Sequence, residues 1–144
     1  MIGSIVVGID GSDTAARAAQ RAAELANALG AKVHLVSAYK PMSGARVGGE
    51  PGPEAAQWTV QRSMHADSVL EQAAVRMRNA GLDVHCHAVN GDPAEALLNV
   101  ADEENADLIL VGNRGMTGAR RMLGSVPNKL SHHANCDVMI VATS

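Results

Sequence analysis

The sequence predicts a single doubly wound α/β domain over residues 1–144, with a five-stranded parallel sheet covered by helices on both faces. Apolar runs of strand length alternate with longer segments of helical composition along the whole chain. The runs are rich in Val, Ile and Leu without polar alternation, which is typical of strands buried on both faces. A chain of 144 residues that is 47% hydrophobic and 19% charged is large enough to bury one core.

The first half of the chain predicts two strands and two helices. "SIVVGID" (residues 4–10) and "KVHLVSAY" (residues 32–39) are the strands, and an alanine-rich helix over residues 14–29 lies between them and stops at Gly30. Residues 40–54 are rich in Gly and Pro, and we expect an exposed loop there, acting as a lid or an insertion. A helix over residues 53–80 follows. Its expected sheet-facing side carries Trp58, Met64, Val69, Ala73 and Met77.

The second half continues the alternation. Asp92 is the expected N-cap of a helix that has Pro93 at its first position, where the missing N–H of proline is not needed. The expected strands are residues 82–89, 107–112 and 136–143, and the expected helices are residues 92–106 and 125–134.

The order of the strands follows from the right-handedness of βαβ crossovers. Winding outward from the first strand and then returning to its other side gives the strand order 3-2-1-4-5. Ligands of such sheets bind at the carboxyl ends of the strands, where the winding reverses. That crevice lies between "GIDGS" (residues 8–12) and "GNRG" (residues 112–115), so these two glycine-rich segments are predicted to face each other.

Several features of these segments suit phosphate groups. Gly112 and Gly115 allow the backbone to approach a ligand closely, and the helix that follows Gly124 presents unpaired N–H groups and a positive dipole end. Ser125 is the expected N-cap of that helix and adds a hydroxyl group. The nearby positive charges belong to Arg114, Arg120, Arg121 and Lys129. These residues predict a polyphosphate ligand, most simply a nucleotide.

Other classes of protein are not supported. Gly-Lys-Ser/Thr of a Walker A motif and the G-x-G-x-x-G dinucleotide fingerprint are both missing, and Asp10 has no paired acid of the response-regulator kind. The net charge of -3 and the scarcity of aromatic residues indicate no nucleic-acid binding. Apolar runs are too short to span a membrane, and the N-terminus lacks a signal-peptide pattern, so we expect a cytoplasmic protein.

Two further side-chain patterns bear on the chemistry of the chain. Asp10 has two compatible interpretations: it is a ligand-binding residue, or it belongs to the cap of the first helix, a role that Ser12 would fill equally.

His85 and His87 alternate on one strand and share a face, as two ligands of a metal site would. No third ligand is evident from the spacing, so we expect no metal there. No nucleophile with an adjacent base is evident in the sequence either, so no catalytic residue is predicted.

The chain resembles the universal stress protein family, in its nucleotide-binding branch, over its whole length. The resemblance rests on "VVGIDGS", "DLILVGNRG" and "GSVPNKLSHHANCDVMIV". The family motif is similar to G-x2-G-x9-G-[ST], which Gly112, Gly115 and Gly124-Ser125 match. The spacer here, residues 116–123, has eight residues in place of nine, so we expect a tighter loop.

The resemblance implies an ATP site, with ADP, AMP or cyclic AMP as alternatives and Mg²⁺ as a possible companion. It also implies a homodimer formed through the last strand, residues 138–141. The expected site residues are Gly8 and Asp10 near the adenosine, Ala38 at the adenine, and Gly112, Asn113, Arg114, Gly115, Met116, Gly124, Ser125 and Val126 around the ribose and phosphates.

Three functions follow from these observations as alternatives. The first is an adenine-nucleotide-binding stress protein that acts as a sensor or regulator and is not chiefly an enzyme. The second is a slow ATPase or nucleotidyl transferase that uses the same pocket. The third is a dimeric interaction module without nucleotide.

Overall fold

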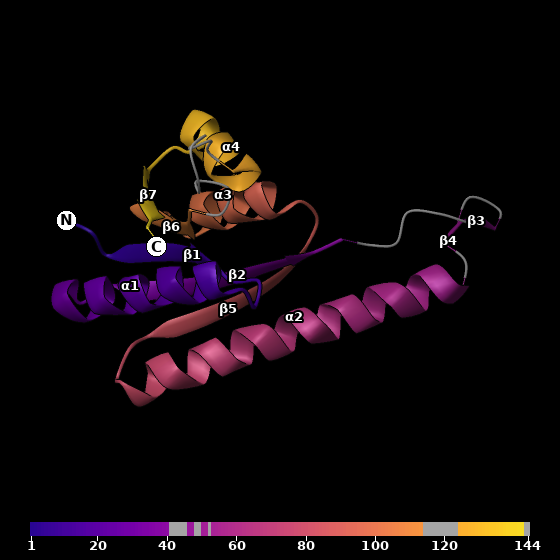
Figure 1. Ribbon diagram of the computed structural model, residues 1–144, viewed down its shortest axis with the longest axis horizontal. Helices are drawn as coiled ribbons and strands as arrows, with labels where there is room; N and C mark the ends of the chain where they lie inside the picture. The colour runs from indigo at the N-terminus through magenta and orange to yellow at the C-terminus, as the bar shows by residue number, and fades with distance from the viewer. Residues whose placement is uncertain (41–45, 48–49, 52, 114–123, 143–144) are drawn as a thin grey trace.

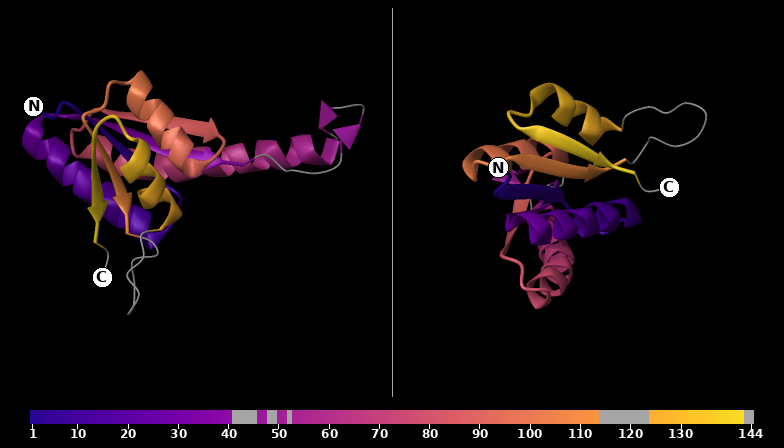
Figure 2. Two further views of the ribbon diagram at one scale, coloured as in Figure 1. Left: turned by 90° about the horizontal axis from the view of Figure 1, so that it is seen from above. Right: turned by 90° about the vertical axis from the view of Figure 1, so that its left-hand side faces the viewer.

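The chain folds as a central parallel sheet between two pairs of helices (Figure 1). The structure is a computed structural model, and it describes residues 1–40, 46–47, 50–51, 53–113 and 124–142. Helices α1 (Asp13–Leu29) and α2 (Pro53–Asn79) cover one face. Helices α3 (Pro93–Glu103) and α4 (Ser125–His133) cover the other, as the views in Figure 2 also show.

The sheet has the predicted order. Its five strands are β1 (Ser4–Gly8), β2 (Lys32–Tyr39), β5 (Val84–Asn90), β6 (Leu108–Gly112) and β7 (Asp137–Val141). They lie side by side as β5-β2-β1-β6-β7, and every pair is parallel. Counted along the chain this is the order 3-2-1-4-5, so the fold-class prediction is confirmed.

Alternate residues of the central strands supply the two halves of the core. Ile5 and Val7 of β1 face α1 and α2, whereas Val6 between them faces α3. All three side chains are fully buried. Since successive side chains of a strand point to opposite faces, a continuous apolar run is what a sheet covered on both sides requires.

Helix α1 begins at Asp13, one residue before the predicted start, and ends at Leu29 as the sequence indicates. The Oγ atom of Ser12, the N-cap, accepts a hydrogen bond from the backbone N–H of Ala15 at 3.2 Å. Gly30 has φ of +69° and ψ of +30°, and its N–H donates to the carbonyl oxygen of Ala26. This left-handed conformation suits glycine, because a Cβ would be strained there.

Helix α2 packs on the sheet along its C-terminal half only. Its buried residues Ala66, Leu70, Ala74 and Met77 repeat every three or four positions and contact β2 and β5. Figure 1 shows the N-terminal half of the helix extending past the sheet. Trp58 and Met64 are accordingly exposed, at 41% and 65%, so the prediction that they face the sheet is wrong. A helical repeat fixes which side of a helix is apolar, but not where the sheet ends.

The segment between β2 and α2 contains two short strands that were expected to be loop. β3 (Arg46–Val47) and β4 (Glu50–Pro51) pair in antiparallel fashion. The other residues of the expected lid, 41–45, 48–49 and 52, lie outside the described residues, so the lid remains a prediction.

Within the part of the chain that the structure describes, no helix combines the length and apolar character that crossing a membrane requires.

Candidate functional site

A cavity of about 510 Å³ lies at the carboxyl ends of β1, β2 and β6. Its position is the one predicted from the reversal of the winding, where ligands of doubly wound sheets bind. Its volume falls within the range of small-molecule sites. Seven of the residues that the sequence analysis selected line it: Gly8, Asp10, Ala38, Gly112, Gly124, Ser125 and Val126.

The floor of the cavity is apolar. Val36 and Ala38 point to the same face of β2 because they are two residues apart, and Leu97 of α3 packs beside them in one buried cluster. Val111 of β6 adds a further buried side chain. A flat aromatic ring fits such a surface well, since its burial requires no charged partner.

The rim of the cavity is formed by the N-terminal ends of three helices. Thr14 and Ala15 come from the first turn of α1, Pro93 from that of α3, and Ser125 from that of α4. The first backbone N–H groups of a helix have no intrahelical acceptor, and the helix dipole makes this end positive. The positive ends of these three helices favour an anionic group at the rim. Ser12 and Asp92 accept a hydrogen bond from an N–H group of α1 and of α3, respectively, so α4, whose N-cap Gly124 makes no side-chain hydrogen bond, is the least capped of the three within the described residues.

About half of the lining was not predicted from the sequence. The additional residues are Ile9, Thr14, Ala15, Val36, Pro93, Leu97, Val111 and Pro127. Val36 could have been predicted from the sequence, because residues two apart on a strand, such as Val36 and Ala38, share a face. The contribution of α3 could not be predicted in this way, because it depends on how that helix crosses the sheet.

Asp10 supports the loop that leads into α1. Its Oδ1 atom accepts a hydrogen bond from the backbone N–H of Ser12 at 2.9 Å and another from the hydroxyl group of Ser12. Ser12 is the N-cap, and its Oγ atom also lies 3.0 Å from Oγ1 of Thr14. Asp10 therefore lines the cavity and also holds the cap of α1, so its two interpretations are compatible.

Helix α4 begins at Ser125, but its N-cap lies one residue earlier than predicted. Gly124 is the N-cap, because its carbonyl oxygen accepts the first hydrogen bond of the helix, from the N–H of Asn128 at 3.0 Å. Ser125 is the first helical residue, so the prediction that it is the N-cap is wrong. Among the residues that the structure describes, no side chain caps this helix. The exposed hydroxyl group of Ser125 is consequently not used in capping, and it stands at the edge of the cavity.

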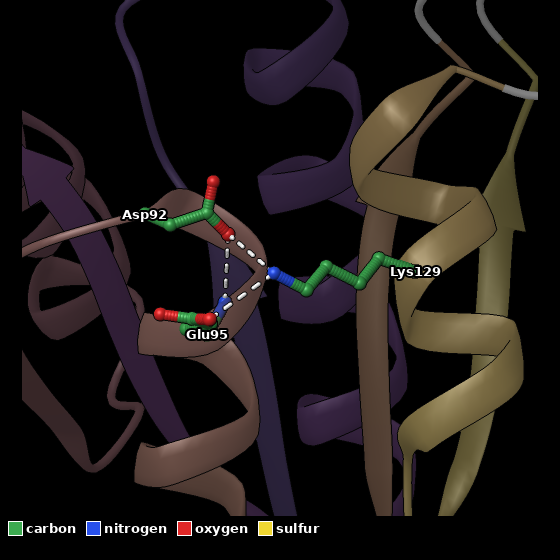
Figure 3. A network of polar contacts seen from close by, with 3 residues as sticks. All are labelled: Asp92, Glu95 and Lys129. Atoms are coloured by element: carbon green, nitrogen blue, oxygen red, sulfur yellow. Dashed lines mark hydrogen bonds and ion pairs between the residues drawn. The ribbon is translucent and has the colours of Figure 1, made fainter.

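Lys129 connects α4 to the start of α3 (Figure 3). Its Nζ atom lies 3.4 Å from Oδ2 of Asp92 and 3.2 Å from Oε1 of Glu95. The same carboxyl group of Asp92 accepts a hydrogen bond from the N–H of Glu95, as an N-cap does. This backbone N–H, followed by the ammonium group of Lys129, lowers the pKa of Asp92. Lys129 was expected to supply mobile charge to a ligand, but it is engaged in this network.

One predicted site residue lies beside the cavity, and three fall outside the described residues. Asn113 is 8% exposed, and its backbone N–H donates to the carbonyl oxygen of Val141 at 3.1 Å, so among the described residues it is a buried neighbour of the cavity and not part of its lining. Arg114, Gly115 and Met116 lie outside the described residues, as does the eight-residue spacer.

Residues 1–142 match the sequence pattern of the Universal stress protein family. The chain belongs to this family. A universal stress protein of Mycobacterium tuberculosis strain H37Rv is 43% identical over 144 residues, which cover 98% of this chain and 97% of the relative. The family assignment that the motifs indicated is therefore confirmed.

Two solved universal stress proteins share the fold and hold an adenine nucleotide. One, determined in complex with cAMP, is 37% identical, with a TM-score of 0.75 and coverage of 99% of each chain. The other, from Archaeoglobus fulgidus in complex with dAMP, is 28% identical, with a TM-score of 0.69 and coverage of 97% of this chain and 98% of its own.

Proposed function

We propose that this universal stress protein binds an adenine nucleotide in the cavity at the carboxyl ends of β1, β2 and β6. ATP is the first candidate. The observation that carries the proposal is the joining of an apolar floor to a rim of three helix N-termini. A purine ring suits the floor, and phosphate groups suit the rim. The two relatives determined with cAMP and dAMP support the same ligand class.

We propose that each wall of the cavity holds one part of the nucleotide. The adenine ring lies against Ala38 at the end of β2, and the ribose lies near Asp10 and Gly112. The phosphates lie at Gly124, Ser125 and Val126, where the first turn of α4 offers backbone N–H groups. Mg²⁺, where present, accompanies the phosphate oxygens.

We further propose a sensing or regulatory role in which nucleotide occupancy is the signal. Among the described lining residues, no nucleophile stands beside a general base, which is the arrangement that covalent catalysis needs. Measuring phosphate release from ATP tests this point. Repeated turnovers per site that vanish in Asp10→Ala while nucleotide binding survives would favour an enzyme.

Mass spectrometry of the small molecules released on denaturing the purified full-length protein tests the ligand class directly. Calorimetric titration with ATP, ADP, AMP and cAMP then ranks the nucleotides. The expected result is release or micromolar binding of at least one of them. Absence of released nucleotide together with absence of binding heat would favour the nucleotide-free interaction module.

A substitution that fills the cavity, compared with the same substitution on the surface, tests where the nucleotide binds. Ala38→Phe places an aromatic ring where the adenine is expected, so nucleotide affinity should fall by about tenfold or more. Ala28→Phe makes the same chemical change on an exposed position near the C-terminal end of α1 and should leave the affinity unchanged. Equal affinities of the two variants would place the nucleotide elsewhere.

We also propose a homodimer formed through β7. This strand lies at an edge of the sheet, and its residues Val138, Met139 and Ile140 are partly exposed. An apolar edge strand is stabilised when a second chain covers it. Sedimentation equilibrium should give a dimer for the native chain and a weakened dimer for Ile140→Lys, with Val75→Lys on the exposed side of α2 as control. A monomeric native chain contradicts the proposal.

A further inference from the structure

A cluster of histidines lies on the sheet near the opposite ends of the strands from the cavity. His34 of β2 pairs in register with His85 of β5, and His87 lies two residues further along. The three side chains project from the face that α3 covers, since Val36 and Val89 on the same alternation join the cluster packed against α3. His34 and Ala38 are four residues apart, so the two sites are separated by roughly 13 Å along β2.

The histidines are arranged around the buried ring of His34. This residue is 4% exposed. Its Nδ1 atom lies 3.0 Å from Nε2 of His87, and the rings of His34 and His85 stack with centroids 5.2 Å apart. Nε2 of His85 points instead to Asp83, whose Oδ1 atom is 2.9 Å away. His85 therefore packs against His34 without directing a nitrogen atom at it, whereas His87 directs Nε2 at His34.

Helix α3 contributes a carboxyl group to the same place. Glu104, the C-cap of α3, has its Oε2 atom 4.0 Å from Nε2 of His34. One nitrogen atom from each of His34 and His87 and one carboxylate oxygen atom of Glu104 all lie within 4.8 Å of one another. His34 and Glu104 are thus the ligands that the sequence did not reveal beside His87, and they remove the reason for expecting no metal at these histidines.

The distances are close to those of a transition-metal site. Zinc binds imidazole nitrogen and carboxylate oxygen at about 2.0–2.2 Å, which places neighbouring ligand atoms of a tetrahedron roughly 3.3 Å apart. Nδ1 of His34 and Nε2 of His87 already stand at 3.0 Å. Oε2 of Glu104 lies 4.0 Å from the other ring nitrogen of His34, Nε2, and this side chain, 40% exposed, has to turn toward Nδ1 to join the other two ligands.

We propose that His34, His87 and Glu104 bind a divalent transition-metal ion of the zinc class, with a water molecule completing the coordination. The donor set of two imidazoles and one carboxylate is suited to such ions and poorly suited to Mg²⁺ or Ca²⁺, which prefer oxygen ligands. The ion joins β5, at the edge of the sheet, to β2 and α3. It acts as a structural link that stabilises the folded chain in proportion to its occupancy.

Co²⁺ is the probe of choice, because tetrahedral Co²⁺ absorbs visible light and is displaced by Zn²⁺. Titration of the untagged, metal-stripped full-length protein should give one Co²⁺ per chain, and one equivalent of Zn²⁺ should abolish the absorption. Zn²⁺ should also raise the melting temperature. His87→Gln and Glu104→Gln each remove one ligand at a partly or fully exposed position, so Co²⁺ affinity should fall by about tenfold or more in both.

The control replaces two histidines outside the cluster. The double variant His132→Gln and His133→Gln changes exposed side chains in the last turn of α4 and should bind Co²⁺ as the native chain does. Circular dichroism establishes that each variant is folded, and Glu104→Gln, on the surface, keeps the test valid if His87→Gln unfolds. Three results overturn the proposal: absence of stoichiometric binding to the native chain, native affinity in Glu104→Gln, or loss of binding in the control.

Discussion

Gly112, at the end of β6, packs directly against the backbone of Thr14 in the first turn of α1. A Cβ atom at position 112 would lie 2.7 Å from the carbonyl oxygen of Thr14 and 2.9 Å from its Cβ. The close approach of β6 and α1 thus depends on the absence of a side chain. The first glycine of the nucleotide motif has a packing role in this chain in addition to any contact with a ligand.

Gly112→Ala is therefore expected to destabilise the fold. The added methyl group meets rigid backbone, so the free energy of unfolding should fall by about 1–3 kcal/mol. Urea denaturation followed by circular dichroism measures the change. Gly3→Ala is the matched control, since a Cβ at position 3 meets only the carboxyl group of Asp107 at 3.8 Å. Equal stability of the two variants would show that α1 moves away without cost.

The cap of α1 leads to a second prediction. Ser12→Ala removes the acceptor for the N–H of Ala15 and should lower the free energy of unfolding by about 1 kcal/mol. Ser12→Asn restores a capping oxygen and should recover most of the loss. Thermal and urea unfolding of both variants measure the difference. A loss in Ser12→Asn equal to that in Ser12→Ala would mean that the hydrogen bond from Ser12 to Asp10 matters more than the cap.

The lowered pKa of Asp92 should make the free energy of unfolding depend on pH. Its pKa is lowered in the folded chain, first by the N–H of Glu95 and then by Lys129, so the unfolded chain binds a proton more readily. The resulting stabilisation is present above the ordinary pKa of about 3.9 and is lost as the pH falls through the lower folded value. Asp92→Asn keeps a capping oxygen but does not titrate.

Unfolding of the native chain and of Asp92→Asn between pH 2 and pH 7 measures this contribution. The native chain should be the more stable at pH 7, and the difference should shrink as the pH falls below about 4. Lys129→Gln removes the ion pair and leaves the cap. When Asp92→Asn is made in a Lys129→Gln chain, the stability difference that it causes at pH 7 should therefore be smaller but still present. A difference that stays constant across this range would contradict the role assigned to Asp92.

The sequence was sufficient to predict the sheet and the place of the cavity. Runs such as "LILV" (residues 108–111) identify buried strands, and the handedness of crossovers limits the order in which they lie. The approach of Glu104 to His34 was not predictable in this way, because it depends on how α3 crosses β2. The N-cap of α4 was predicted one residue late, since the choice between Gly124 and Ser125 depends on which carbonyl oxygen accepts from the N–H of Asn128.

Ser125 gives the last prediction, and it contrasts with Ser12. Both serines stand at the start of a helix beside the cavity, but only Ser12 caps its helix with its side chain. Ser125→Ala should therefore change the free energy of unfolding by no more than about 0.5 kcal/mol. Nucleotide affinity should nevertheless fall by about tenfold or more, because a hydrogen bond to a charged phosphate contributes about 1.5–3 kcal/mol.

Parallel urea unfolding and calorimetric titration of Ser125→Ala and Ser12→Ala separate the two roles. Ser12→Ala should show the larger loss of stability, and Ser125→Ala the larger loss of affinity. A loss of about 1 kcal/mol in the stability of Ser125→Ala would mean that its hydroxyl group caps α4 after all. Unchanged affinity would remove Ser125 from the phosphate site and leave the backbone N–H groups of α4 as the anion-binding element, since no substitution of that side chain removes them.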